Sequence, residues 1–234
     1  MKRTFIIYCC LCIISMISCS HNHNTIVINT SNWSTKDSVN NTHITLSCSY
    51  IKEGKTGLKD SINTWLCKVF GDDSCKFKGV IQNMLKTNGQ ALKNSFLNEK
   101  VEFSKTVRVI YEDSDYITLL LNEHCLANDN PGYYGSIGCT FRKIDGHKMG
   151  WEFLKNKNRH NLIQEIENGL IEYFEITESS SNTKGELLRD HLLCDKIPLP
   201  KSEPYLTDSG IELIYQQNEI ACLAEGLPKV TIKR

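Results

Sequence analysis

The residues that could carry out chemistry lie in the middle of the chain, around His124 and Cys125. A histidine beside a cysteine could act as a general base next to a thiolate nucleophile. The apolar residues around them predict a β-strand, and neighbouring side chains in a strand point to opposite faces of the sheet. We therefore expect that these two side chains do not meet as a catalytic pair.

The residues that follow them form a polar and aromatic segment that could contact a partner. The run 128–132, Asn-Asp-Asn-Pro-Gly, has the composition of a turn between two strands. Loops carried by a rigid scaffold commonly hold recognition residues, so this hairpin loop and the loop 179–184 are the candidate contact surfaces. The candidate partner-binding residues are His124, Asn128, Asp129, Asn130, Tyr133 and Tyr134.

Aromatic residues nearby offer an alternative chemistry. Tyr133, Tyr134 and Trp151 could stack on a sugar ring if they are exposed beside polar groups. Aromatic residues at strand and helix positions are more often part of a core. If all three are buried, recognition of a glycan loses its physical basis.

The chain lacks the sequence signatures of common enzymes. It contains no GxSxG elbow, P-loop, GxGxxG run or HExxH motif. Asp72-Asp73 is more typical of a solvated turn than of a metal site, and no Cys/His spacing matches a zinc site. We expect no catalytic residue, no metal and no cofactor, and a hydrolase is the least favoured function.

The first nineteen residues predict export. Lys2 and Arg3 precede an apolar run from residue 5 to residue 17, which is the pattern of a secretory signal peptide over residues 1–18. Ser18-Cys19 resembles a lipobox, in which the cysteine is acylated, so Cys19 is the predicted lipidation site. An ordinary signal peptide is the alternative. From the lipobox we expect an exported protein that is anchored to the membrane by lipid, in the periplasm or at the cell surface. Residues 19–41 would then be the acylated cysteine and a polar tether.

Cysteine usage fits an exported protein. Seven cysteines follow Cys19, and an odd number leaves at least one of them unpaired within the chain. Cys67 and Cys75 are the nearest pair, and they flank a predicted turn at residues 71–73. We expect a possible disulfide between them.

The charge balance excludes some partners. Loss of Lys2 and Arg3 with the signal peptide reduces the 27 basic residues to 25, against 27 acidic residues. A nucleic-acid-binding protein usually shows a basic surplus, so no nucleic acid is expected. Attraction to anionic lipid is not expected either, which leaves the lipid anchor as the contact with the membrane.

Hydrophobic periodicity predicts an α+β fold of antiparallel sheets with helices packed on one face, in two small subdomains. Alternation of apolar residues or turn signals predicts strands over 42–51, 101–111, 116–125, 133–143, 211–215 and 230–232. Apolar spacings of three and four predict helices over 57–70, 77–97, 162–174, 186–194 and 218–224. Pro198, Pro200 and Pro204 predict an extended segment before the last strands.

Two motifs resemble a known bacterial family. Residues 205–211, Tyr-Leu-Thr-Asp-Ser-Gly-Ile, followed by Glu219-Ile220-Ala221 and Gly226, are similar to the C-terminal signature of the RsiV-like extracellular domain. Residues 115–119, 144–146 and 151–154 are similar to that family's strand, Asp-Gly turn and following helix. Residues from about 44 to 111 are similar in layout to the PdaC-like domain that precedes it.

The resemblance implies a PdaC-like domain over 42–112 and a RsiV-like domain over 113–234. The chain departs from the family pattern at Asn218, where an aromatic residue is usual, and at residues 124–128, where a Gly-Gly-Ala-His run is usual. The family's contact residues therefore do not carry over to this hairpin.

Because members of this family sense lysozyme or accompany a peptidoglycan deacetylase, the resemblance implies an envelope binding protein. The expected partner is a protein such as a lysozyme-like muramidase, and the alternative is a peptidoglycan- or glycan-binding accessory module.

Overall fold

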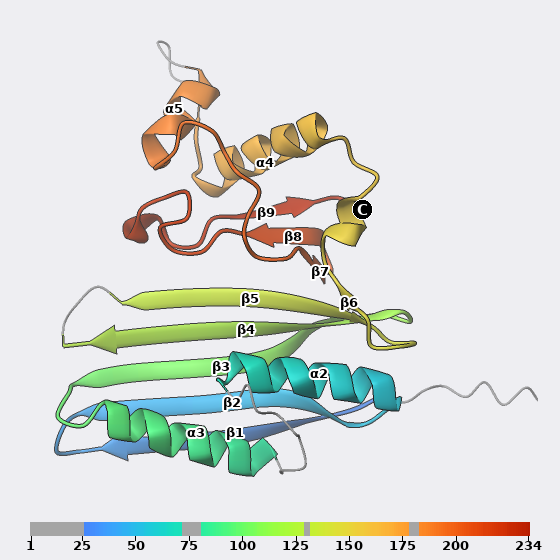
Figure 1. Ribbon diagram of the computed structural model, residues 1–234. Helices are drawn as coiled ribbons and strands as arrows, with labels where there is room; N and C mark the ends of the chain where they lie inside the picture. Colours follow the sequence, from blue (N-terminus) through green and yellow to red (C-terminus); the bar gives the residue numbers. More distant parts are fainter. Residues whose placement is uncertain (1–25, 72–80, 129–131, 178–182) are drawn as a thin grey trace, which may run out of the picture.

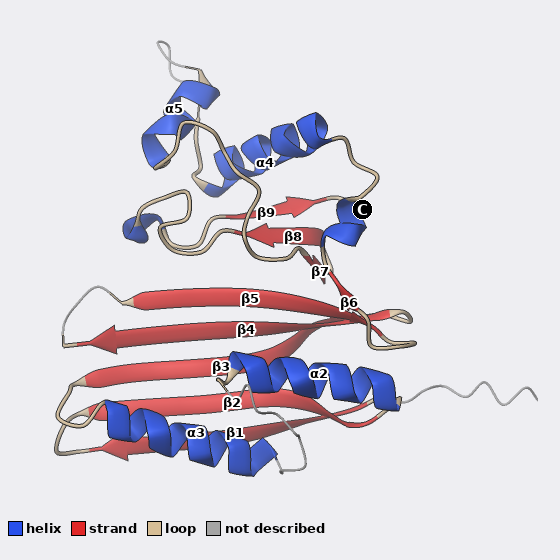
Figure 2. Cartoon of the chain, in the orientation of Figure 1, coloured by secondary structure: helices blue, strands red, loops and turns tan. Residues whose placement is uncertain are grey.

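Two β-sheets, each with helices on one face, make up the chain (Figures 1 and 2). The computed structural model describes residues 26–71, 81–128, 132–177 and 183–234. The first sheet follows the sequence order β1 (Val27–Asp37), β2 (Thr42–Glu53), β3 (Val101–Glu112), β4 (Tyr116–Ala127), β5 (Tyr133–Arg142) and β6 (Lys148–Met149). The second contains β7 (Tyr205–Thr207), β8 (Gly210–Ile214) and β9 (Lys229–Ile232).

The helices of the described residues are four α-helices and two short 3-10 turns. They are α2 (Thr56–Val69), α3 (Ile81–Ser95), α4 (Arg159–Tyr173), α5 (Lys184–His191), η1 (Trp151–Leu154) and η2 (Leu223–Glu225). The α+β class is confirmed. The pairs are antiparallel except for β2 and β3, which run parallel because α2 and α3 carry the chain back across the sheet between them.

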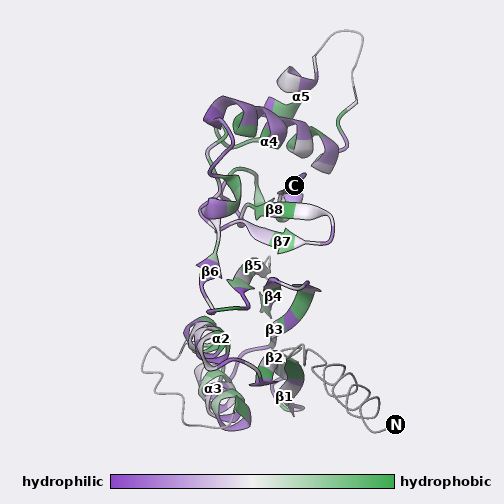
Figure 3. Ribbon diagram, turned by 90° about the vertical axis from the view of Figure 1, so that its right-hand side faces the viewer, coloured by the Kyte–Doolittle hydropathy of each residue, from purple (hydrophilic) through white to green (hydrophobic). Residues whose placement is uncertain are grey.

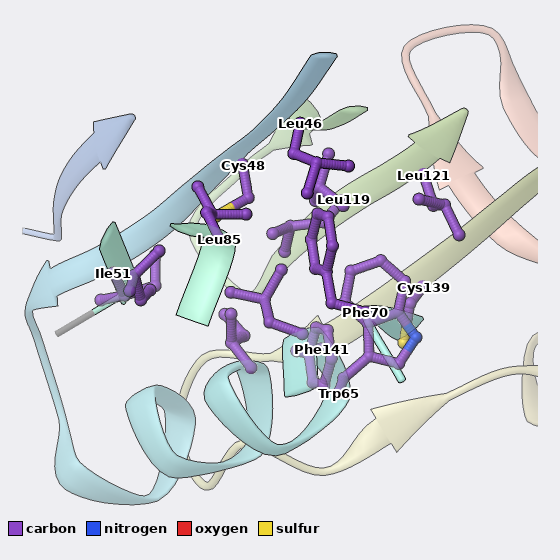
Figure 4. Close-up of a cluster of buried hydrophobic side chains, with 14 of the residues drawn as sticks. Leu46, Cys48, Ile51, Trp65, Phe70, Leu85, Leu119, Leu121, Cys139 and Phe141 are labelled. Atoms are coloured by element: carbon purple, nitrogen blue, oxygen red, sulfur yellow. The ribbon is translucent and has the colours of Figure 1, made fainter. Parts of the chain in front are cut away.

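The first core lies between α2, α3 and one face of the six-stranded sheet (Figure 4). Alternate residues of β2, Ile44, Leu46 and Cys48, point into it because strand side chains alternate between faces. The ring of Trp65 from α2 meets Phe141 from β5 edge to face at 6.2 Å. Burial of each such side chain stabilises the fold by about 1.5–3 kcal/mol.

Glycine 89 lets α3 approach the sheet. A Cβ at this position would lie 2.3 Å from the ring of Trp33 on β1, so only glycine permits this contact. The sequence leaves open whether Gly89 bends or breaks the helix, and α3 continues through it. The close contact therefore fixes where α3 lies across β1.

The opposite face of the first sheet carries small polar residues, and no helix of the described residues covers it. Figure 3 looks along this sheet and shows α2 and α3 on one side of it. The open face presents half-buried polar side chains from three central strands, including Thr45, Ser47, Ser104, Thr106 and Asn122. Polar alternation of this kind is expected where one face of a sheet meets water.

The second core lies between α4, α5 and the three-stranded sheet. Leu162, Ile166 and Leu170 of α4 pack against buried residues of β8 and β9. The Asn158 side chain caps α4 by accepting a hydrogen bond from the His160 backbone N–H at 2.8 Å.

The two sheets meet where β7 packs on the open face of β3, β4 and β5. A Cβ at Gly138 would lie 2.1 Å from the Tyr205 ring, so β5 carries a glycine where that tyrosine lies. The Leu206 backbone N–H donates to Thr140 Oγ1 at 2.9 Å, and Thr140 also bonds Thr118. These buried contacts join the two cores.

Several expectations are wrong. Residues 27–37, expected within the tether, form β1, because their Asn, Ser and Thr side chains face water while Ser31 and Trp33 turn toward α3. The expected boundary at 112/113 falls between β3 and β4, which pair with each other, so the two cores divide after β6 instead. Residues 218–224 form a turn and part of η2 rather than a helix.

Candidate functional site

Three turns converge at one end of the first sheet, and we call this end the loop end. They are the β1–β2 turn, the segment between α3 and β3, and the β4–β5 turn, all on the left in Figure 1. Each contains an asparagine with positive φ: Asn41 at 51°, Asn98 at 74° and Asn128 at 51°. Asparagine adopts this left-handed conformation more readily than other residues with a Cβ, which explains why these positions can turn so tightly.

The loop end exposes large apolar and aromatic side chains. Val39 is 89% exposed, Leu97 57%, Tyr133 53% and Tyr134 45%. Tyr133 and Tyr134 are therefore exposed, as contact with a partner requires, while Trp151 packs partly buried against the second core. Because two of the three aromatic residues are exposed, glycan recognition keeps its physical basis.

Tyr134 and His124 form an aromatic pair on the open face. They lie opposite one another on β5 and β4, and their rings stack at 4.6 Å with an angle of 23°. The buried Nε2 of His124 has no hydrogen-bond partner among the described residues. We call the part of the chain up to the end of β6 the first region and the part after it the second region. Gln217 of the second region accepts a hydrogen bond from the Tyr134 backbone N–H at 3.0 Å and holds the start of β5 in place.

A pocket of 540 Å³ continues the open face beyond this pair. It is lined by Lys36, Asn41, His43, Lys100, Glu102, Leu126 and Asn128. His43 and Glu102 become neighbours through the parallel pairing of β2 and β3, although 58 residues separate them along the chain. The lining combines basic groups, one carboxylate and two amides, which suits contact with a polar or anionic group.

Asn128 fixes the wall of this pocket. Its backbone N–H donates to the Lys100 carbonyl at 2.9 Å, and its Oδ1 accepts from the Lys100 N–H at 3.1 Å. The β4–β5 turn is thereby tied to the start of β3. Asp129 and Asn130, the other predicted contact residues of this turn, lie outside the described residues.

Tyr133 and Cys125 lie on the face covered by the helices, opposite to His124 and Tyr134. This arrangement confirms that His124 and Cys125 point apart. Burial raises the pKa of the Cys125 thiol, and the carboxylates of Glu123 and Glu99 raise it further. A raised thiol pKa reduces the thiolate fraction that a nucleophile needs.

Glu123, a neighbour of the predicted site, is held in an ion pair under the end of α2. Its carboxylate lies 2.9 Å from Lys105 Nζ, which also donates to the Val69 carbonyl at 2.8 Å. The same ammonium group lies 5.8 Å from the centre of the Phe70 ring. Glu123 therefore stabilises the packing of α2 on the sheet, on the face away from the pocket.

Three other cysteines, Cys48, Cys67 and Cys139, are buried in the structure. Burial raises the pKa of Cys48 and Cys139 to about 12. Cys67 is buried and disulfide-bonded, and its partner lies outside the described residues, as does Cys75. The Cys67–Cys75 pairing stays a prediction.

Metal ligation and membrane crossing can be assessed for residues 26–71, 81–128, 132–177 and 183–234. No group of three or more His, Cys, Asp or Glu side chains there could hold a metal ion. No helix in the same ranges has the length and apolar character needed to cross a membrane. Cys19 and the loop residues 179–182 lie outside these ranges.

Sequence reasoning found four residues of the loop end, His124, Asn128, Tyr133 and Tyr134, and missed most of the pocket. Lys36, His43 and Glu102 come from strands distant in sequence, and no local motif marks them. Asn41 and Asn98 could have been found, because an asparagine in a polar turn between two regular elements indicates a left-handed turn position.

Comparison with solved structures identifies proteins of the same fold. No family model matches the sequence, and no curated protein matches it closely. A DUF3298 family protein from Bacteroides fragilis superposes with a TM-score of 0.68 at 15% identity, covering 90% of this chain and 91% of the other. A DUF3298 family protein from Pseudomonas aeruginosa gives 0.52 at 10% identity, covering 89% and 90%. The chain thus shares its fold with bacterial proteins of the DUF3298 family.

Proposed function

We propose that this chain is a lipid-anchored binding protein of the bacterial cell envelope, and that its loop end recognises a protein such as a lysozyme-like muramidase. The observation that carries the proposal is that Val39 and Leu97, which lie in turns, and Tyr133 and Tyr134, which begin β5, are all exposed at one end of the sheet. Aromatic and apolar side chains surrounded by polar groups are typical of protein interfaces.

The position of the anchor agrees with this proposal. Cys19 precedes β1, and β1 runs for 11 residues from the opposite end of the sheet toward the loop end. At about 3.3 Å per residue, the strand extends for about 35 Å. An acylated Cys19 would therefore hold the far end of the sheet near the membrane and present the loop end to soluble partners.

The choice of a muramidase as the proposed partner comes from the family resemblance of the sequence motifs. The RsiV-like signature at 205–211 forms the β7–β8 hairpin, whose Tyr205 and Leu206 are buried at the joint between the sheets. These motif residues stabilise the contact between the two sheets and are not exposed to a partner. A muramidase partner rests on the family resemblance, while a contact surface at the loop end rests on the exposed side chains.

A biosensor experiment tests the protein-binding proposal. Protein starting at Ser20, which keeps every described residue, is immobilised and exposed to several lysozyme types. We expect saturable binding to at least one type, and substitution Leu97→Asp should weaken it about tenfold or more, since truncating or charging an interface anchor costs about 2 kcal/mol. No binding at micromolar concentrations to any type would overturn the muramidase partner.

A matched variant controls for nonspecific effects. Ile144 is also an exposed aliphatic residue, 68% accessible, but it lies at the other end of the sheet in the β5–β6 turn. Ile144→Asp introduces the same charge and should leave the affinity unchanged. Equal loss in both variants would show that the loop end is not the contact surface.

The anchor has an independent test. Substitution Cys19→Ala should release the protein from the membrane fraction or leave an unprocessed precursor, because the acyl chains supply the attachment. Metabolic labelling with a fatty-acid analogue should mark the wild type and not the variant. An unlabelled wild type found free in the medium or periplasm would identify an ordinary cleaved signal peptide.

A glycan-binding module is the second candidate, and the stacked Tyr134–His124 pair beside the polar pocket favours it. Pull-down with purified peptidoglycan distinguishes the two functions. Tyr134→Ala should abolish glycan retention, whereas Tyr133→Ala, on the other face of the sheet, should not. A protein partner spread over the loop end should depend on both tyrosines and on Leu97.

A further inference from the structure

A second surface feature lies in the C-terminal region, away from the loop end. A pocket of 750 Å³ opens between α4, α5 and the segment 195–198. Along α4 its lining runs from Arg159 to Ile171, which spans about 18 Å at 1.5 Å per residue. The pocket is thus an elongated groove, and its volume lies within the range of small-molecule sites, about 300–1,000 Å³.

The groove exists because α4 is apolar on two stripes. Leu162, Ile166 and Leu170 face the second core, where each is almost fully buried. Ile163 and Ile171 pack at the edge of this core, where they are only partly buried, and they also line the groove. The apolar pattern of α4 therefore exceeds what its contact with the sheet requires.

Six aliphatic side chains form one part of the lining of the groove. They comprise Ile163, Ile171, Leu188, Leu192, Ile197 and Pro198. None of the lining residues within the described ranges is aromatic, so they offer a flat sugar or nucleobase no stacking platform. Among the described residues of the lining, Asn168 is the one uncharged polar side chain, whereas a peptide backbone would need several hydrogen-bond partners once it lost water. A hydrocarbon chain needs none.

Cations outnumber carboxylates in the lining. Arg159, Arg189 and Lys196 line the groove, and none of them has an ion pair or side-chain hydrogen bond within the part of the chain that the structure describes. Two carboxylates, Glu167 and Asp195, also line it. Arg189 further interacts at longer range with the exposed Glu186, one turn earlier on α5.

We propose that this groove binds a single-chain amphiphile with an anionic head, such as a long-chain carboxylate. The aliphatic walls would take the hydrocarbon chain. The guanidinium groups of Arg159 and Arg189, which suit carboxylates and phosphates by geometry, would hold the head with Lys196. This ligand site goes beyond the proposed partner binding, because it uses other residues in the other region of the chain.

The binding experiment uses dodecanoate below its micelle concentration, titrated calorimetrically into delipidated protein that starts at Ser20. We expect saturable binding of one dodecanoate per chain. Acetate, which has the head without the chain, should not bind. Dodecyltrimethylammonium, which has the chain with a cationic head, should bind at least about tenfold more weakly, because charge-assisted hydrogen bonds to the head are lost. Equal affinity for the two dodecyl compounds would overturn the anionic-head assignment.

A variant that fills the groove locates the site. Gly185 lines the pocket, and a Cβ added there would meet no atom within 4 Å. Gly185→Phe should therefore fold normally and abolish dodecanoate binding, while Gly185→Ala should bind as the wild type does. Binding that is unchanged in Gly185→Phe would place the ligand elsewhere and overturn the proposal.

A charge variant provides a second, independent readout. The double substitution Arg159→Gln and Arg189→Gln should weaken dodecanoate binding about tenfold or more. Arg108→Gln makes the same chemical change on the exposed face of β3 and should have no effect. Circular dichroism and the unfolding midpoint establish that each variant is folded. Unchanged affinity in the double variant would overturn the proposal even if Gly185→Phe binds less.

Discussion

The two sheets of this chain use their second faces differently. The six-stranded sheet packs α2 and α3 on one face, while its other face is polar and largely open. The three-stranded sheet packs α4 and α5 on one side and places β7 against the open face of the first sheet. The larger sheet therefore keeps most of one face and one end exposed, whereas the smaller sheet is covered by helices on one side and contacts the larger sheet through β7.

The same comparison explains where each candidate site lies. The loop end is built from turns and strand ends at one end of the first sheet, so its side chains are exposed without weakening the first core. The groove lies between helices of the second region, where α4 has more apolar surface than the short sheet can cover. The first region thus exposes side chains at the end of its sheet, and the second region contains a groove between α4 and α5.

Core truncation is expected to have the largest effect and tests whether the regions fold together. Leu119 of β4 and Leu213 of β8 are fully buried, one in each core. Leu119→Ala and Leu213→Ala should each reduce the free energy of unfolding by about 2–5 kcal/mol. Because buried contacts join the sheets, Leu213→Ala should also accelerate amide hydrogen exchange in β4 and β5. Unchanged protection of those strands would show that the two regions unfold independently.

Substitution at the joint should have the next largest effect. Gly138→Ala places a Cβ against the buried Tyr205 ring and should reduce the free energy of unfolding by about 3 kcal/mol. Gly185→Ala is the matched control, because its added Cβ meets nothing, and it should be neutral or slightly stabilising. Urea denaturation measures both variants. Equal stability of the two would mean that the joint can relax around an added methyl group.

Loss of a helix cap should have a smaller effect, confined to the second region. Thr183 and Glu186 form a capping box at the start of α5, in which each side chain accepts a hydrogen bond from the other's backbone N–H. Thr183→Ala should reduce the free energy of unfolding by about 1 kcal/mol. Hydrogen exchange should accelerate in α5 and not in α2. A change in α2 as well would point to coupling that the contacts do not predict.

The smallest effect concerns acid stability of the first region. Hydrogen bonds from the Arg142 side chain and the His147 backbone N–H hold the pKa of Asp145 well below its usual range. A depressed carboxyl pKa contributes stability that is present above the unfolded-state pKa of about 4 and is lost as pH falls toward the folded-state value. Asp145→Asn should therefore be less stable than the wild type at pH 7, with a difference that shrinks below about pH 4. Unfolding midpoints across this range measure it, and a difference independent of pH would contradict the assignment.

Local patterns in the sequence determined most of the elements and the division into helices and strands. Apolar spacing is a local property of the chain, and it predicted α2, α4 and β2 to β5 within a few residues of their ends. It also predicted that His124 and Cys125 point apart, because alternation in a strand does not depend on its neighbours. β1 was missed because its polar composition resembles that of a tether, and only pairing with β2 makes it a strand.

The tertiary structure alone decided which residues share a surface. Parallel pairing of β2 with β3 brought His43 beside Glu102, and no pattern near either residue indicates that register. The exposure of Tyr133 and Tyr134 depends on where the strands end and on what covers them, which composition does not specify. Tyr205 lies against Gly138 because β7 packs on β5 there. Periodicity in a sequence reports which face of an element is apolar, but the partner of that face is chosen by long-range packing.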